Sequence, residues 1–149
     1  MKRIFFLMML TALMLPSIAD ASVTWLSLKD GAEKARAEKK PMIVDFFFGK
    51  GCSRCELLQK NVYDDPAISK KIMADFVPIR VDLTKPLTRE EEALGNKFDY
   101  KNDCLLLFLD DKGELFLDKA GKRLCFIDKV DPEWFIDYLD QVKEQISRR

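Results

Sequence analysis

The sequence predicts an α/β fold, a three-layer sandwich in which a central mixed β-sheet is flanked by helices. Segment 42–48 is a near-continuous apolar run, which is typical of a strand buried on both faces of a parallel or mixed sheet. Strand-like segments alternate with helix-like segments, and the chain ends in a hairpin and an amphipathic helix. These elements lie in residues 22–149, a length that suits a single domain.

The first 21 residues have the pattern of a secretory signal peptide. Lys2 and Arg3 form a charged start, segment 4–15 is apolar apart from one threonine, and Ala19 and Ala21 supply small residues at a cleavage site. The alternative is an uncleaved membrane anchor, but segment 4–15 is shorter than the ~20 apolar residues that a spanning helix needs. We therefore expect cleavage after Ala21, or after Ala19, no membrane insertion of the mature chain, and a periplasmic or secreted protein.

Helix boundaries in the mature chain carry their own signals. Pro41 ends a charged helix, because proline has no amide hydrogen to donate. Asp65 and Asp131 each precede a proline, the pattern of a capped helix start, and Thr88-Arg-Glu-Glu91 is a capping box. The expected elements are, in order, an edge strand 25–26, helix 28–40, strand 42–48, helix 52–62, helix 66–74, strand 76–83, helix 88–98, strand 104–109, a turn 110–113, strand 114–117 and helix 132–146. The apolar face of the last helix comprises Trp134, Phe135, Tyr138, Leu139 and Val142.

Composition excludes several classes of function. The chain has no histidine, so Ser-His-Asp hydrolysis, Cys-His proteolysis and His-ligated zinc or haem are ruled out. It has 25 basic and 25 acidic residues, and loss of Lys2, Arg3 and Asp20 with the signal leaves a net charge of −1. A near-neutral chain gives no electrostatic reason to bind nucleic acid. All four cysteines lie in the mature part, and export favours disulfide chemistry.

Cys52 and Cys55 fall where strand 42–48 gives way to a helix. Their spacing puts both sulfurs on the first helical turn, close enough for a disulfide, with Cys52 at the tip and Cys55 one turn further in. A helix N-terminus stabilises a thiolate, so the pattern predicts a reversible thiol/disulfide site. The alternatives are a structural disulfide or half of a zinc site. We expect no metal, because zinc needs four ligands and Cys104 and Cys125 are too far apart in sequence to form a second zinc-binding pair.

This segment resembles the active-site region of the thioredoxin superfamily, including the aspartate in the preceding strand, here Asp45. From about Trp25 to about Val142 the chain most resembles the thioredoxin-like C-terminal domain of the bacterial transmembrane thiol:disulfide interchange protein and its small secreted relatives. Two departures are visible. Gly51 stands where the family has an aromatic residue, and the loop from Asp45 to Cys52 is one residue longer.

The resemblance implies a thioredoxin-like fold and a monomer that exchanges disulfides with protein thiols and disulfides, without a bound cofactor. It favours a reductase fed by a membrane electron donor, serving cytochrome c maturation or the repair of wrong disulfides. The competing interpretations are a redox-inert thioredoxin-fold binding module or chaperone, and a thiolate metal carrier.

Two charged residues are expected to tune the motif. A carboxylate within strand 42–48 is costly to bury, and burial raises its pKa, so Asp45 is a candidate proton relay to Cys55. The alternative is that Asp45 turns toward solvent or pairs with a lysine. Arg54, between the cysteines, places a cation that lowers the thiol pKa, or is simply a solvated helix residue. Phe46, Phe47 and Phe48 are assigned to the core rather than to a substrate surface.

Cys104 occupies the position where the resemblance places the family's cis-proline. A non-proline cis bond costs about 2.5–4 kcal/mol, so the Asp103–Cys104 peptide is expected to be trans and the substrate groove to be reshaped. Three interpretations remain open. Cys104 and Cys125 form a second disulfide, Cys104 exchanges with the motif cysteines, or both thiols are buried and inert.

Overall fold

The computed structural model describes residues 22–101, 106–124 and 131–148. The expected signal peptide, Asp103, Cys104 and Cys125 lie outside these residues, so the interpretations that depend on them remain predictions. The elements in chain order are α1 (Leu28–Glu38), β1 (Met42–Phe47), α2 (Ser53–Leu58), the π-helix η1 (Gln59–Tyr63), α3 (Pro66–Asp75), β2 (Val77–Asp82), α4 (Arg89–Lys97), β3 (Leu106–Leu109) and α5 (Pro132–Ser147).

The sheet is mixed, as predicted, with the strand order β2-β1-β3. The central strand β1 runs parallel to β2, with Asp45 opposite Arg80, and antiparallel to β3, with Ile43 opposite Phe108. The expected edge strand 25–26 is reduced to one bridge, in which Leu26 bonds to the backbone of β2 on both sides of Ile79. The apolar run that predicted β1 thus lies in the middle of the sheet, where both of its faces are covered.

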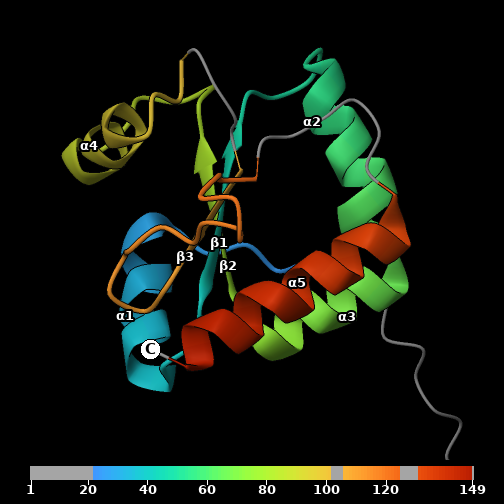
Figure 1. Ribbon diagram of the computed structural model, residues 1–149. Helices are drawn as coiled ribbons and strands as arrows, with labels where there is room; N and C mark the ends of the chain where they lie inside the picture. Colours follow the sequence, from blue (N-terminus) through green and yellow to red (C-terminus); the bar gives the residue numbers. More distant parts are fainter. Residues whose placement is uncertain (1–21, 102–105, 125–130, 149) are drawn as a thin grey trace, which may run out of the picture.

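Side chains of β1 alternate between two apolar clusters on opposite faces of the sheet. Met42, Val44 and Phe46 pack with residues of α1 and α4, whereas Ile43 packs with residues of α2, η1, α3 and α5. Figure 1 shows α1 and α4 on one side of the strands and α2, α3 and α5 on the other. The three-layer α/β sandwich predicted from the sequence is confirmed. Asp45 shares the face of Ile43 and therefore lies under the layer that carries the cysteine motif.

The helix expected at 52–62 is present but is not uniform. After α2 it continues as the π-helix η1, in which the Asp64 N–H donates to the carbonyl of Gln59 at 2.8 Å. Leu58 and Val62 point into the core, as their spacing predicted. Single π turns occur often at functional sites, because they rotate the side chains that follow them. Here the π turn carries Gln59 and Tyr63.

The capping signals are confirmed, and two expectations about the C-terminal half are corrected. Asp65, Thr88 and Asp131 all cap helices, and Thr88 forms the predicted capping box with Glu91. The strand expected at 114–117 is reduced to one bridge between Leu109 and Leu115, beside a turn in which the Asp110 carboxylate accepts the N–H groups of Lys112 and Glu114. Trp134 lies on the expected face and stacks on Tyr138, but it is 42% exposed, whereas its neighbour Phe135 is buried.

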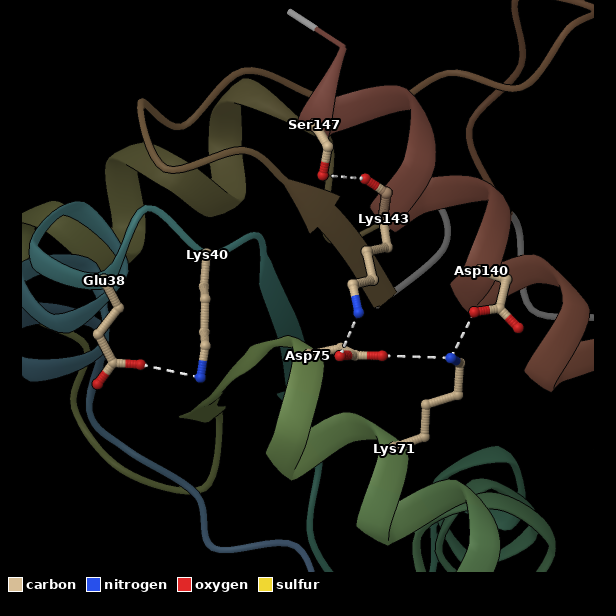
Figure 2. A network of polar contacts seen from close by, with 7 residues as sticks. All are labelled: Glu38, Lys40, Lys71, Asp75, Asp140, Lys143 and Ser147. Carbon is tan, nitrogen blue, oxygen red and sulfur yellow. Dashed lines mark hydrogen bonds and ion pairs between the residues drawn. The ribbon is translucent and has the colours of Figure 1, made fainter.

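An ionic network joins α3 to α5 on the face that carries the motif (Figure 2). The Asp75 carboxylate accepts from Lys143 at 2.6 Å and from Lys71 at 3.2 Å, and Lys71 also reaches Asp140. Lys71 and Asp75 are each largely covered, which limits the competition from water. The network fixes the two helices behind the motif relative to each other.

Candidate active site

Cys52 and Cys55 form a disulfide at the start of α2, with their Cα atoms 5.2 Å apart. Cys52 is the N-cap residue, and its sulfur accepts the Cys55 N–H at 3.2 Å. Cys52 is half-buried, whereas Cys55 is only 8% exposed. The spacing argument therefore placed the pair correctly, with Cys52 the more exposed residue and Cys55 the buried one.

The loop before the cysteines depends on two glycines in the left-handed region of backbone conformation. Gly49 has φ +84°, and a Cβ there would lie 2.6 Å from the Thr84 methyl carbon. Gly51 has φ +91°, a conformation that an aromatic residue rarely adopts. The missing aromatic side chain ahead of Cys52 thus has a backbone explanation. At Gly51 the loop turns through a backbone conformation that favours glycine.

Asp45 is buried, at 4% exposed, and makes an ion pair with Arg80. The Arg80 Nε donates to one Asp45 oxygen at 2.9 Å, and the Arg80 Nη2 lies 2.8 Å from the same oxygen in the ion pair. Burial raises the pKa of Asp45 to about 6, and the charge and hydrogen bonds of Arg80 oppose that rise. The expected increase in pKa is confirmed. Asp45 does not turn toward solvent, and the cation that pairs with it is an arginine rather than a lysine.

Arg80 is the site residue that sequence reasoning missed. Its guanidinium lies over the ring of Trp25 at 4.1 Å and near the rings of Phe47 and Tyr63 at 4.8 and 5.5 Å. Its Nη2 also donates to the Gln59 side chain at 3.3 Å, which connects β2 to the π turn. A signal was available, because an arginine interrupts the apolar strand 76–83 as Asp45 interrupts strand 42–48.

Tyr63 completes this buried cluster. Its side chain is 1% exposed, and among the described residues its hydroxyl has no hydrogen-bond partner. Burial, reinforced by the nearby Asp45 carboxylate, raises the pKa of Tyr63 well above its usual value. Tyr63 therefore keeps its proton at neutral pH and adds no charge beside Asp45.

The aromatic run after Asp45 is only partly core. Phe46 is buried and Phe47 is half-buried, but Phe48 is 43% exposed, which corrects the assignment of all three to the core. The reason is that β1 ends at Phe47, so Phe48 already belongs to the loop that leads to the cysteines. Arg54 is exposed on the first turn of α2. Its effect on the thiol remains a prediction.

Within the described ranges, no three Cys, Asp or Glu residues gather in a group that could hold a metal ion. In the same part of the chain, none of the helices has the length and apolar character needed to cross a membrane.

The fold and the Cys52–Cys55 pair define a thioredoxin-fold protein with a disulfide at the start of α2. Residues 24–109, more than half of the chain, match the model of a family described as thioredoxin-like, and the chain belongs to this family. A comparison with curated protein sequences finds no match.

Solved structures support the fold. The chain is 17% identical to the DsbH oxidoreductase with a TM-score of 0.65, covering 87% of this chain and 90% of that one. It is 21% identical to a disulphide isomerase from Xylella fastidiosa, with a TM-score of 0.58 and coverage of 88% and 98%. It is 20% identical to the DsbD C-terminal domain of Neisseria meningitidis in the oxidised form, with a TM-score of 0.56 and coverage of 79% and 98%. At these identities the similarity establishes the fold alone.

Proposed function

We propose that the protein is an exported thiol:disulfide oxidoreductase that reduces disulfides of protein partners in the periplasm or outside the cell. One observation carries the proposal. Cys52 is partly exposed at the start of α2, while Cys55 is buried and joined to it by a disulfide. An accessible attacking thiol backed by a protected second thiol is the arrangement that two-step exchange requires.

In the proposed reaction the Cys52 thiolate attacks one sulfur of the partner's disulfide and forms a mixed disulfide, and the partner's other sulfur leaves as a thiolate. Cys55 then attacks the Cys52 sulfur and releases the partner's second thiolate. The two cysteines lose two electrons and the partner's disulfide gains two. A donor dithiol, delivered by a membrane protein, restores the reduced pair.

Asp45 is proposed as the group that exchanges a proton with Cys55 during these steps. A carboxyl with a pKa of about 6 both accepts and gives a proton near neutral pH. Asp45 lies on the sheet face covered by α2 and η1, and Arg80 links its carboxylate to Gln59 at the start of η1. Because Arg80 keeps its charge, it stabilises the carboxylate that remains after Asp45 has given up its proton.

Export and the direction of electron flow have separate support. The pattern of residues 1–21 supports export. The resemblance of the sequence to the C-terminal domain of the interchange protein supports a reductase that receives its electrons from a membrane donor. The printed names of the other structural relatives, an oxidoreductase and a disulphide isomerase, are consistent with thiol chemistry.

Trapping in the native compartment tests the proposal. The Cys55→Ser variant retains the attacking thiol but lacks the resolving one, so it should accumulate mixed disulfides through Cys52. These appear as bands that a reductant removes on non-reducing gels, and mass spectrometry identifies the partners. A Cys52→Ser, Cys55→Ser double variant is the matched control. Absence of mixed disulfides, together with a motif potential below about −300 mV, would indicate a redox-inert module with a structural bridge.

A further inference from the structure

Glu56, directly after the second cysteine, is bonded on both sides of Cys52. Its side-chain Oε1 accepts the N–H of Gly51 at 3.1 Å, and its own N–H donates to the carbonyl of Cys52 at 3.0 Å. The first contact spans five residues and closes the motif into a ring. The Glu56 carboxylate therefore contacts the backbone of Gly51, the residue directly before the attacking cysteine, Cys52.

This contact has two consequences for a thiolate at Cys52. It occupies the Gly51 N–H, so that donor is not available to stabilise a negative sulfur. It also holds a carboxylate against the backbone of the residue that precedes Cys52, and like charges disfavour each other. The other charged side chains of the loop and first turn, Lys50 and Arg54, are cations, so Glu56 is the anion among them.

The effect on redox equilibrium follows from a balanced exchange. The protein disulfide and two glutathione thiols give the protein dithiol and glutathione disulfide, with two electrons passing from glutathione to the protein. Only the reduced protein contains a thiolate that the Glu56 carboxylate can destabilise. A carboxylate held at this position therefore shifts the equilibrium toward the disulfide.

Resting on the exchange activity proposed above, we propose that Glu56 is a positioning residue that makes the Cys52–Cys55 pair a stronger reductant. It does so by holding its carboxylate beside Cys52 and by occupying the Gly51 N–H. Glu56, which is not itself oxidised or reduced, would thus favour electron transfer from the cysteine pair to the partner's disulfide.

The test compares Glu56→Gln, which keeps an oxygen acceptor but removes the charge, with Glu56→Ala, which removes both. Each variant is equilibrated with reduced and oxidised glutathione, and the pH dependence of Cys52 alkylation by iodoacetamide gives the thiol pKa. Both variants should show a lower Cys52 pKa and an equilibrium shifted by about two- to fivefold toward the dithiol, as expected for one charge at an exposed position. Glu33→Gln, on the exposed side of α1 and across the sheet from the motif, should match the wild type.

The dependence on ionic strength distinguishes an electrostatic effect of Glu56 from a steric one. Added salt should narrow the difference between the wild type and Glu56→Gln, because an exposed charge is screened. The proposal is overturned if Glu56→Gln leaves both the pKa and the equilibrium unchanged, whether or not Glu56→Ala shifts them. If wild-type Cys52 fails to exchange with glutathione at all, the proposed function itself fails, and that outcome is distinct from active exchange with no effect of Glu56.

Discussion

Asp45→Asn changes how the stability of the oxidised protein depends on pH. The pKa of this carboxyl rises from 3.8 in the unfolded chain to about 6 in the fold, because burial disfavours the charged form more than Arg80 favours it. A group whose pKa is raised by folding contributes stability that is complete below pH 3.8 and is lost as the pH rises through 6. Asparagine, which does not titrate, resembles the protonated state at every pH.

The size of the effect follows from the shift. A rise of about two units, at 1.36 kcal/mol per unit, corresponds to about 3 kcal/mol lost between pH 4 and pH 7. Urea unfolding at a series of pH values should therefore show the wild type falling by about 3 kcal/mol relative to Asp45→Asn across this interval. A pH-independent difference in stability between the two proteins reflects the altered hydrogen bonds to Arg80. The test is therefore the difference between the slopes of their free energies of unfolding against pH.

An NMR titration and a control variant test the same prediction independently. The side-chain carboxyl carbon of Asp45, followed by NMR in the oxidised protein, should titrate with a midpoint near 6. Asp137→Asn, at an exposed position on α5, is the matched control and should parallel the wild type. Parallel profiles for the wild type and Asp45→Asn, or a titration midpoint below 4, would refute the reasoning.

Five other outcomes are expected. Cys52→Ser should abolish disulfide exchange in a glutathione-coupled assay. Asp45→Asn should slow reduction about 10-fold near neutral pH. If the reduction rates of Asp45→Asn equal those of the wild type across pH, Asp45 is purely structural. Partial burial raises the pKa of Asp75, but hydrogen bonds from Lys143 and Lys71 outweigh it and lower the pKa. Asp75→Asn should therefore lower the free energy of unfolding in urea by about 1 kcal/mol at pH 7, and this loss should disappear as the pH falls below 3.8. Equal stability of the variant and the wild type at pH 7 would contradict this prediction. Gly49→Ala should destabilise the fold by about 1 kcal/mol or more, because it combines positive φ with the close approach of Thr84, and an unchanged melting temperature would argue against this loop geometry. N-terminal sequencing of the native protein should begin near Ser22, and a soluble cytoplasmic form with Met1 intact would contradict export.

Signals that act over a few residues were sufficient to predict much of the fold. The caps Asp65, Thr88 and Asp131 satisfy N–H groups of their own helices, so their effect does not depend on distant packing. The cysteine pair belongs to the same class, because two positions three apart at a helix start lie close in any fold. The run that forms β1 was also recognisable, since a strand covered on both faces gives a near-continuous apolar segment.

The environment of Asp45 was decided by tertiary structure. Its partner Arg80 is 35 residues away in sequence, and the two meet only because the register of the parallel pair β1 and β2 sets them opposite each other. The rings of Trp25 and Tyr63 that surround Arg80 come from two further segments. The sequence alone determined that a carboxylate would lie in the strand that precedes the cysteines, whereas its burial was decided by the structure. The pairing of β1 with β2 and the π turn decided which cation meets it, because contacts between distant segments depend on strand register and helix packing, which local residue patterns do not encode.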